Sequence, residues 1–223
     1  MQYDNPQALL DHAQSFAGST LGELCERYKE QVPQQLLHKK GWVGQFIEMI
    51  LGATSGSLAQ PDFPDIGVEL KTLPIDEQGR PLESTYVSVV PLIDIQGLCW
   101  ENSVVRHKLM HVLWVPIVAS REIPIEKRQI AMPFLWQPSV EQEQTLKQDF
   151  EDILDHVSMG GIEQVDARLG EILQVRPKAA NSKALTDAIG PDGSTIKTLP
   201  RGFYLRPQFT KHCLQQYFTE TQV

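Results

Sequence analysis

The sequence predicts a mixed α/β fold in which a mixed sheet is flanked by helices, and two observations support this prediction. Helix-start signals and apolar stripes of helical spacing dominate the first fifty residues, whereas short runs rich in valine, isoleucine and aromatic residues follow further along. A chain of 223 residues can also bury a large core. We therefore expect one domain, residues 1–223, that combines helices and strands.

Three helices are expected before residue 52. Asn5 and Pro6 make a typical helix start, and the spacing of Thr20 and Glu23 predicts a capping box for a second helix. The third helix is expected from Trp42 to Leu51, where a glycine follows and ends it. Each segment carries an apolar stripe, so each has one face to bury.

Strands and further helices are expected over the rest of the chain. The predicted strands are residues 66–73, 86–92, 112–118, 130–136, 173–178 and 203–206, and the predicted helices are 139–158 and 209–218, with a tight turn at 189–195. We expect the strand at 86–92 to return beside the strand at 66–73. Pro116 predicts that its strand lies at a sheet edge or at a bulge.

The candidate catalytic residues lie between positions 61 and 71. Glu69 and Lys71 are two residues apart, so their side chains project from the same face of the predicted strand. Asp62 precedes them across a bend set by Pro61 and Pro64, from which it can curl back towards that face. Two carboxylates suit a hard cation such as Mg²⁺, and an adjacent ammonium suits the charge that develops in phosphodiester hydrolysis.

The Glu-x-Lys tripeptide by itself has a simpler interpretation, namely an ion pair on a solvated strand face. The longer pattern is more specific, because an aspartate on a proline-bounded turn precedes the strand that carries the pair. This arrangement matches the PD-(D/E)xK pattern of nucleases. Magnesium-dependent cleavage of nucleic acid is therefore one hypothesis, and a non-catalytic strand is the other.

Two further charged residues are candidates for the same site. Glu48 stands among apolar residues of the third predicted helix, and Lys108 closes a short basic cluster that begins at Arg106. Each also has an ordinary interpretation, an exposed helix position for Glu48 and a solvated turn for the basic cluster. If the nuclease hypothesis holds, Glu48 is a further carboxylate near the metal and Lys108 projects over the site.

Composition narrows the class of protein. The net charge of −8 argues against a protein that coats nucleic acid non-specifically, yet the charge is uneven. Residues 139–167 hold eight acidic residues and one lysine, whereas residues 168–213 hold eight basic and three acidic residues. Three distant cysteines without metal-site spacing indicate reduced thiols, and there is no signal peptide or apolar run of membrane length. We expect a soluble cytoplasmic protein.

Several blocks of sequence together resemble a known family. They are Pro-Asp-Phe-Pro-Asp with Gly-Val-Glu-Leu-Lys-Thr-Leu-Pro, Val-Arg-His-Lys before Leu-Trp-Val-Pro, Leu-Gln-Val-Arg-Pro-Lys-Ala-Ala-Asn-Ser, and Gly-Phe-Tyr-Leu-Arg. In this order and spacing, over nearly the whole chain, they resemble the MutH family of mismatch repair endonucleases. That family belongs to the PD-(D/E)xK restriction-endonuclease-like group. The resemblance implies a two-lobed clamp around a DNA cleft, with approximately residues 1–110 carrying most of the catalytic site and 111–223 gripping DNA.

The resemblance also implies roles for individual residues. Asp62 and Glu69 match the metal-binding acids, Lys71 matches the catalytic lysine, and Glu48 and Lys108 match accessory active-site positions. The positions that match those approaching the recognition sequence are Lys40, Gly41, Arg176, Pro177, Lys178 and Tyr204. The implied cofactor is Mg²⁺.

The implied activity is a nick in the unmethylated strand, 5′ to the G of GATC, in double-stranded DNA that is hemimethylated or unmethylated. The implied partner is MutL, with MutS acting indirectly, and the implied state is a monomer without a membrane anchor. Two other functions stay open. A GATC-specific restriction endonuclease would cut both strands, although the chain has no second Asp…Glu-x-Lys core. A non-catalytic DNA-binding module would explain the basic stretch but not the convergent acids.

Overall fold

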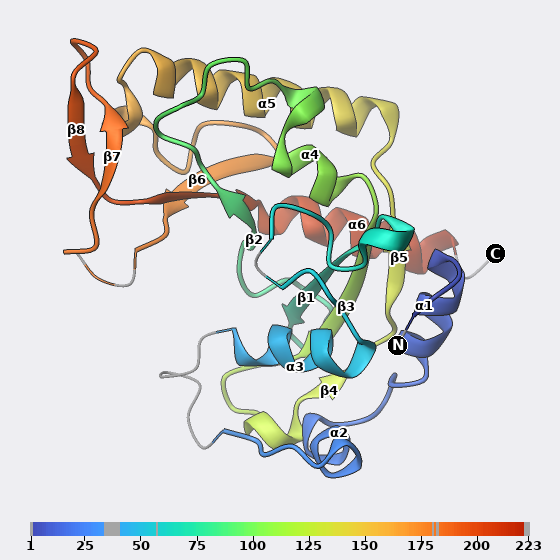
Figure 1. The fold of residues 1–223 in the computed structure, drawn as a ribbon. Coiled ribbons are helices and arrows are strands. Elements are labelled where there is room, and N and C mark those ends of the chain that lie inside the picture. Colours follow the sequence, from blue (N-terminus) through green and yellow to red (C-terminus); the bar gives the residue numbers. More distant parts are fainter. Residues whose placement is uncertain (1, 34–40, 57, 180, 182, 221–223) are drawn as a thin grey trace. The chain divides into compact units, whose positions relative to one another are not determined.

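The computed structural model describes residues 2–33, 41–56, 58–179, 181 and 183–220 (Figure 1). The chain forms two compact units, each drawn from separate stretches of sequence. Unit 1 consists of Met1–Glu83, Met110–Gln137 and Lys211–Val223, and unit 2 consists of Ser84–Leu109 and Pro138–Thr210. The division into a catalytic and a DNA-gripping lobe near residue 110 concerns function and stays a prediction. The mixed α/β class is confirmed.

Unit 1 is built on a four-stranded sheet. Its strands are β1 (Glu69–Ile75), β3 (Val112–Val118), β4 (Gln129–Ile130) and β5 (Phe134–Trp136). β1 runs parallel to β3, and β4 and β5 pair antiparallel with the other edge of β3. β1 therefore lies at the edge of this sheet, a position that the site described below uses.

The helices of unit 1 form where the sequence predicted them. They are α1 (Pro6–Gln14), α2 (Leu21–Tyr28) and α3 (Trp42–Leu51). The Asn5 side chain caps α1, Thr20 and Glu23 form the predicted capping box, and Gly52 ends α3 with a φ of 75°. Their apolar faces share one core with the sheet side chains Leu70, Leu113, Val115 and Ile117.

The sheet corrects three expectations. β1 begins at Glu69 and not at residue 66, because Pro64–Ile66 form a 3₁₀ turn and Gly67 has a φ of 65°. β3 is a central strand, although it contains Pro116. The strand predicted at 130–136 is interrupted, because only Gln129–Ile130 and Phe134–Trp136 pair with β3.

The place of Pro116 explains how a central strand tolerates a proline. Its carbonyl accepts a hydrogen bond from Ala131 N at 2.8 Å, on the side of β3 that faces β4 and β5. An N–H of the same residue would point to that side as well, at the interruption between the two short partner strands. The missing donor therefore falls where the ladder with β4 ends, and it interrupts neither short partner strand.

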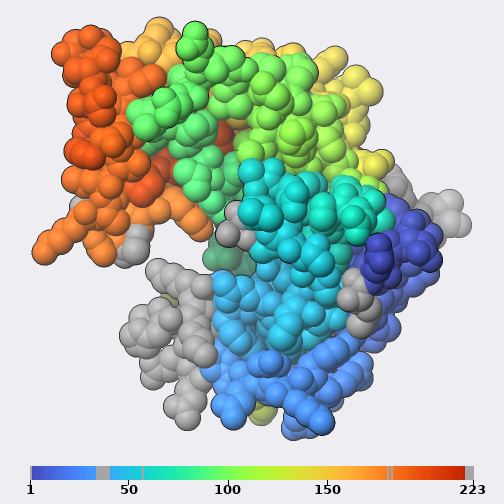
Figure 2. Space-filling view, in the orientation of Figure 1, coloured from blue at the N-terminus to red at the C-terminus, as the bar shows by residue number. Residues whose placement is uncertain are grey.

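Unit 2 contains a second sheet and a hairpin. The strands β2 (Thr85–Val89), β9 (Arg201–Leu205) and β6 (Leu173–Pro177) form an antiparallel sheet, and β7 (Thr186–Ile189) pairs with β8 (Thr195–Thr198). β2 pairs with β9, so the expectation that it lies beside β1 is wrong. The hairpin reaches the surface of unit 2, where its strands are orange in Figure 2.

The long acidic helix α5 (Val140–Ser158) packs on the second sheet. Ser139 caps it, and Phe150 contacts the rings of Trp100 and Phe203. Asp149 is 5% exposed, and its carboxylate accepts hydrogen bonds from three backbone N–H groups, those of residues 171–173. Val140 is 69% exposed, so it lies outside the buried face of this helix.

The remaining helices are α4 (Val104–Leu109) in unit 2 and α6 (Pro207–Glu220), whose residues from Lys211 onward belong to unit 1. The rings of Tyr217 and Phe134 stack at 4.6 Å within unit 1. Among the helices that the structure describes, none is long and apolar enough to cross a membrane.

Candidate functional site

Asp62 is held against β1, as its predicted bend requires. The turn closes through Phe63, whose N–H donates to Val68 O at 2.9 Å. Asp62 is 4% exposed, and its Oδ2 accepts from the N–H of Leu70 at 2.9 Å, while the Ser55 hydroxyl lies 3.3 Å from Oδ1. The carboxylate therefore lies beside the peptide bond that joins Glu69 to Leu70.

The outer edge of β1 is what makes this contact available. Glu69 N donates to His111 O, on the side of β1 that faces β3. The N–H of the next residue, Leu70, points to the opposite side, where an edge strand has no neighbour. Asp62 takes the place of a neighbouring strand at this residue.

Glu69 and Lys71 form a buried ion pair. Lys71 Nζ lies 2.5 Å from Glu69 Oε1, and the two side chains are 14% and 1% exposed. The interpretation of this pair as a solvated surface contact is therefore wrong. Burying two charges is a weak source of stability, because the loss of hydration offsets much of their attraction. Such a pair beside a second buried carboxylate is typical of a functional site.

Glu48 reaches the same strand from α3. A Cβ placed on Gly44 would lie 3.7 Å from Thr72 Oγ1 and 3.9 Å from Glu48 Oε1. Glu48 thus lies near β1, on the helix that covers the face carrying Thr72. Glu69 projects from the other face, so Glu48 and Glu69 lie on opposite sides of the strand at whose outer edge Asp62 is held.

The donor set suits Mg²⁺. This ion takes oxygen ligands, is commonly held by one or two carboxylates, and keeps several waters or substrate oxygens. Asp62 and Glu69 supply two carboxylates on neighbouring parts of one short segment. Within the described ranges, no three His, Cys, Asp or Glu side chains form a metal-binding group. Two carboxylates would leave the other coordination positions of the ion to water or substrate oxygens.

Lys108 lies on α4 in unit 2, where its residue is 9% exposed. The basic cluster is helical and not the solvated turn considered above, and Arg106 Nε lies 3.1 Å from Glu143 Oε1. The catalytic role of Lys108 stays a prediction.

Trp114, the register partner of Lys71, has a buried indole N–H without a hydrogen-bond partner among the described residues.

A second group of predicted residues gathers on one face of the β2–β9–β6 sheet. The register places Tyr204 between Tyr86 and Gln174, and Arg176 opposite Gly202. Since residues two apart in a strand share a face, these side chains belong to one surface. Arg176 Nη1 donates to Ser84 Oγ at 2.6 Å.

Two tyrosines and a lysine are packed together on this surface. The rings of Tyr86 and Tyr204 meet edge to face with centroids 5.4 Å apart, and Lys178 Nζ lies 3.7 Å from the centroid of Tyr86. Burial, together with the nearby Tyr204, raises the pKa of the Tyr86 phenol, so it stays protonated near neutral pH. Pro177 ends β6 and is exposed.

Gly202 makes room for both rings. A Cβ at this position would lie 2.9 Å from Cε2 of Tyr204 and 3.0 Å from Cε2 of Tyr86. Neither Tyr86 nor Gly202 was among the predicted site residues. They could be found only from the pairing of strands that lie more than a hundred residues apart. Of the two remaining predicted positions, Gly41 caps α3 with a φ of 88°, and Lys40 lies outside the described residues.

Comparison with known proteins identifies the family of the chain. Residues 51–149 match the family described as "MutH: DNA mismatch repair enzyme MutH". This segment contains Asp62, Glu69, Lys71 and Lys108.

Relatives that match nearly the whole chain carry the name DNA mismatch repair protein MutH. The protein of Serratia proteamaculans is 50% identical over 96% of this chain and 94% of its own. The protein of Haemophilus influenzae is 53% identical over 97% of this chain and 96% of its own. That of Shewanella woodyi is 52% identical over 94% of this chain and 91% of its own. The chain therefore belongs to the MutH family of DNA mismatch repair enzymes.

Proposed function

We propose that the protein is a magnesium-dependent endonuclease that nicks the unmethylated strand 5′ to the G of GATC sites and is stimulated by MutL. The observation that supports this most strongly is the buried Glu69–Lys71 pair at an open strand edge, with Asp62 fixed to the N–H of Leu70. Charges buried in this way cost hydration energy, which a nuclease site would recover when it binds its cation and phosphate.

Each of these side chains has a role in that chemistry. Asp62 and Glu69 would hold Mg²⁺, which polarises a phosphate and acidifies a bound water. Lys71, drawn to Glu69 in the free protein, would donate a hydrogen bond to a phosphate oxygen as negative charge develops there. In the reaction, a water oxygen forms a bond to phosphorus and gives up a proton, while the bond from phosphorus to the leaving sugar oxygen breaks and that oxygen takes up a proton, so that one strand is interrupted.

The sheet surface of Tyr86, Tyr204 and Lys178 is the proposed reader of methylation. A methyl group on adenine N6 projects into the major groove beside the hydrogen-bond donor that a protein can recognise. A tyrosine ring packed against that edge would exclude the methyl group by steric clash. The edge-to-face contact with Tyr86 restrains the ring of Tyr204, which makes such an exclusion more effective.

A nicked-circle assay tests the proposal against both alternatives. Supercoiled plasmid with unmethylated, hemimethylated or fully methylated GATC sites would be incubated with the protein and Mg²⁺, with an excess of chelator as control. The proposal expects open circles from the first two substrates and more of them when MutL is added. Linear product in the first minutes would indicate a restriction endonuclease, and no product would indicate a non-catalytic DNA-binding protein.

A further inference from the structure

A cavity of about 640 Å³ lies beside the candidate catalytic strand, within unit 1. Its walls come from the first turn of α3, from β1 at Thr72, and from the segment between β3 and β4. Its volume is in the range of pockets that hold small ligands, about 300–1,000 Å³. The residues assigned above to metal binding and methylation reading do not line it.

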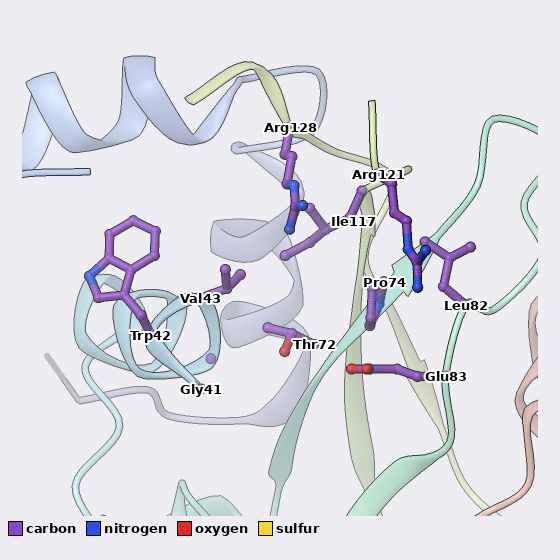
Figure 3. Close-up of a pocket in the computed structure, with 12 residues that line it drawn as sticks. Gly41, Trp42, Val43, Thr72, Pro74, Leu82, Glu83, Ile117, Arg121 and Arg128 are labelled. Atoms are coloured by element: carbon purple, nitrogen blue, oxygen red, sulfur yellow. The ribbon is translucent and has the colours of Figure 1, made fainter. Parts of the chain in front are cut away.

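Two guanidinium groups enter this cavity. Figure 3 shows Arg121 and Arg128 pointing into it from the same segment, while Glu83 points towards Thr72. No hydrogen bond or ion pair to a described residue engages Arg121, and Arg128 has one long contact, from Nε to Ile123 O at 3.4 Å. Guanidinium groups bind phosphate oxygens with two parallel hydrogen bonds, and the two arginines outnumber the one carboxylate among the described residues that line the cavity, that of Glu83, so the cavity favours a phosphate.

The segment that carries both arginines is fixed before any ligand binds. Leu21 N donates to Arg128 O at 2.8 Å, which ties the segment to the start of α2. A Cβ on Gly22 would lie only 2.9 Å from Glu126 O, so α2 and this segment are in close contact. Trp42, on the α3 wall, is stacked on Phe46 at 5.2 Å. A prearranged cavity loses less conformational entropy on binding.

The position of the cavity along β1 identifies the phosphate. Thr72 follows Lys71 directly, roughly 3–4 Å along the strand, but its side chain projects from the opposite face, so the cavity and the proposed catalytic lysine lie on the two sides of the same edge strand. Each strand of B-DNA carries a phosphate about every 3.4 Å of helix axis. A DNA backbone that crosses the outer edge of β1 would therefore place one phosphate in the cavity and another, a few nucleotides away, at Glu69 and Lys71.

We infer that Arg121 and Arg128 form a binding site for a DNA backbone phosphate next to the nicked phosphodiester. This inference rests on the proposed nuclease function and adds a position on the substrate to it. A protein of net charge −8 has little general attraction for DNA, so a pair of cations on one well-anchored segment beside the reactive strand would set the register of the backbone.

Neutralised phosphates test this inference. A duplex with one GATC site would be made in versions that each carry a single methylphosphonate, within five nucleotides of the expected nick. Binding of the full-length protein would be measured by fluorescence anisotropy in chelator, so that no cleavage occurs. We expect one position at which neutralisation weakens the wild type roughly tenfold, the loss of a charge-assisted hydrogen bond.

A methylphosphonate at the same position should hardly change the affinity of the R121Q/R128Q double variant, because that variant no longer has the guanidinium groups that would bind this phosphate. K127Q is the matched control, since Lys127 is an exposed cation of the same segment that does not line the cavity, and it should keep the full response. R121Q alone should lower the slope of log affinity against log salt by about one unit. The R121Q single variant still tests the inference if the R128Q substitution disturbs folding.

The outcomes separate the inference from the function on which it rests. If the wild type neither nicks nor binds GATC duplexes, the proposed function fails. If it nicks and binds, but every methylphosphonate weakens the R121Q/R128Q variant and the wild type equally, the cavity does not hold a backbone phosphate.

Discussion

The two candidate surfaces of this protein are built in opposite ways. The two carboxylates and the lysine at the edge of β1 come from one segment of ten residues, 62–71; both acids are buried, and the lysine side chain is 14% exposed. The tyrosine surface of unit 2 joins strands from residues 85–89, 173–177 and 201–205, and its basic residues Arg176 and Lys178 are exposed. A buried cluster of charge suits chemistry, where small displacements matter. An exposed surface of aromatic and basic residues suits the reading of a large ligand.

The largest effect is expected from removing the metal-binding charges. D62N keeps an oxygen for the N–H of Leu70, and E69Q keeps the size of its side chain, so each removes charge with little change of shape. We expect both to reduce nicking at least a thousandfold, because the carboxylates hold the ion that activates water. Binding to GATC duplexes in chelator should stay within a few-fold of the wild type. S55A, which removes only the neighbouring hydroxyl, is the control and should retain most activity.

The next effect concerns the lysine and distinguishes catalysis from stability. K71Q should lower turnover by roughly 100- to 1,000-fold with a smaller change in affinity, since its charge serves the transition state. It also leaves Glu69 buried without its cation, which should cost about 3 kcal/mol or more of unfolding free energy.

The double variant E69Q/K71Q separates the two consequences. It carries no buried charge at this pair, so its stability in urea should recover towards that of the wild type, while nicking stays absent. Normal turnover of K71Q at saturating DNA would show that Lys71 only anchors the substrate.

A smaller effect is expected from the reading surface, and it should concern selectivity and not rate. In the wild type, a steric clash and a lost hydrogen bond together should make nicking of unmethylated GATC about a hundredfold faster than nicking of fully methylated GATC. Y204S should reduce this ratio. G202A should do the same, because its Cβ displaces both tyrosine rings, whose far ends can move without unfolding the sheet. The measurement is the ratio of nicking rates on the two plasmids. An unchanged ratio in both variants would locate the methyl sensor elsewhere.

The smallest effect is expected for DNA binding, and it distinguishes two basic residues of unit 2. K178Q should lower the salt slope of DNA binding by about one unit if Lys178 contacts a phosphate. The basic stretch alone predicts the same for Arg206, but its guanidinium donates to Gly170 O at 2.8 Å and to Leu169 O at 3.2 Å. R206Q should therefore reduce the melting temperature and leave the slope unchanged. An equal change of slope in both variants would contradict this distinction.

Local sequence determined much of this protein. Helix starts at Asn5 and Thr20, the end of α3 at Gly52, and the cap of α5 at Ser139 follow from contacts within a few residues. The convergence of Asp62 on Glu69 is local for the same reason, because one short bend separates them.

Pairing between distant segments decided the rest. The place of β2 beside β9, the central position of a strand with Pro116, and the contact of Tyr86 with Tyr204 depend on which strands meet. A strand's sequence specifies which face is buried, but not the partner that will bury it. The same holds for the cavity of Arg121 and Arg128, whose shape depends on α2 holding a segment a hundred residues away in the chain. Short-range hydrogen bonds therefore determine the elements and the catalytic bend, whereas packing over long distances determines the surfaces that meet the substrate.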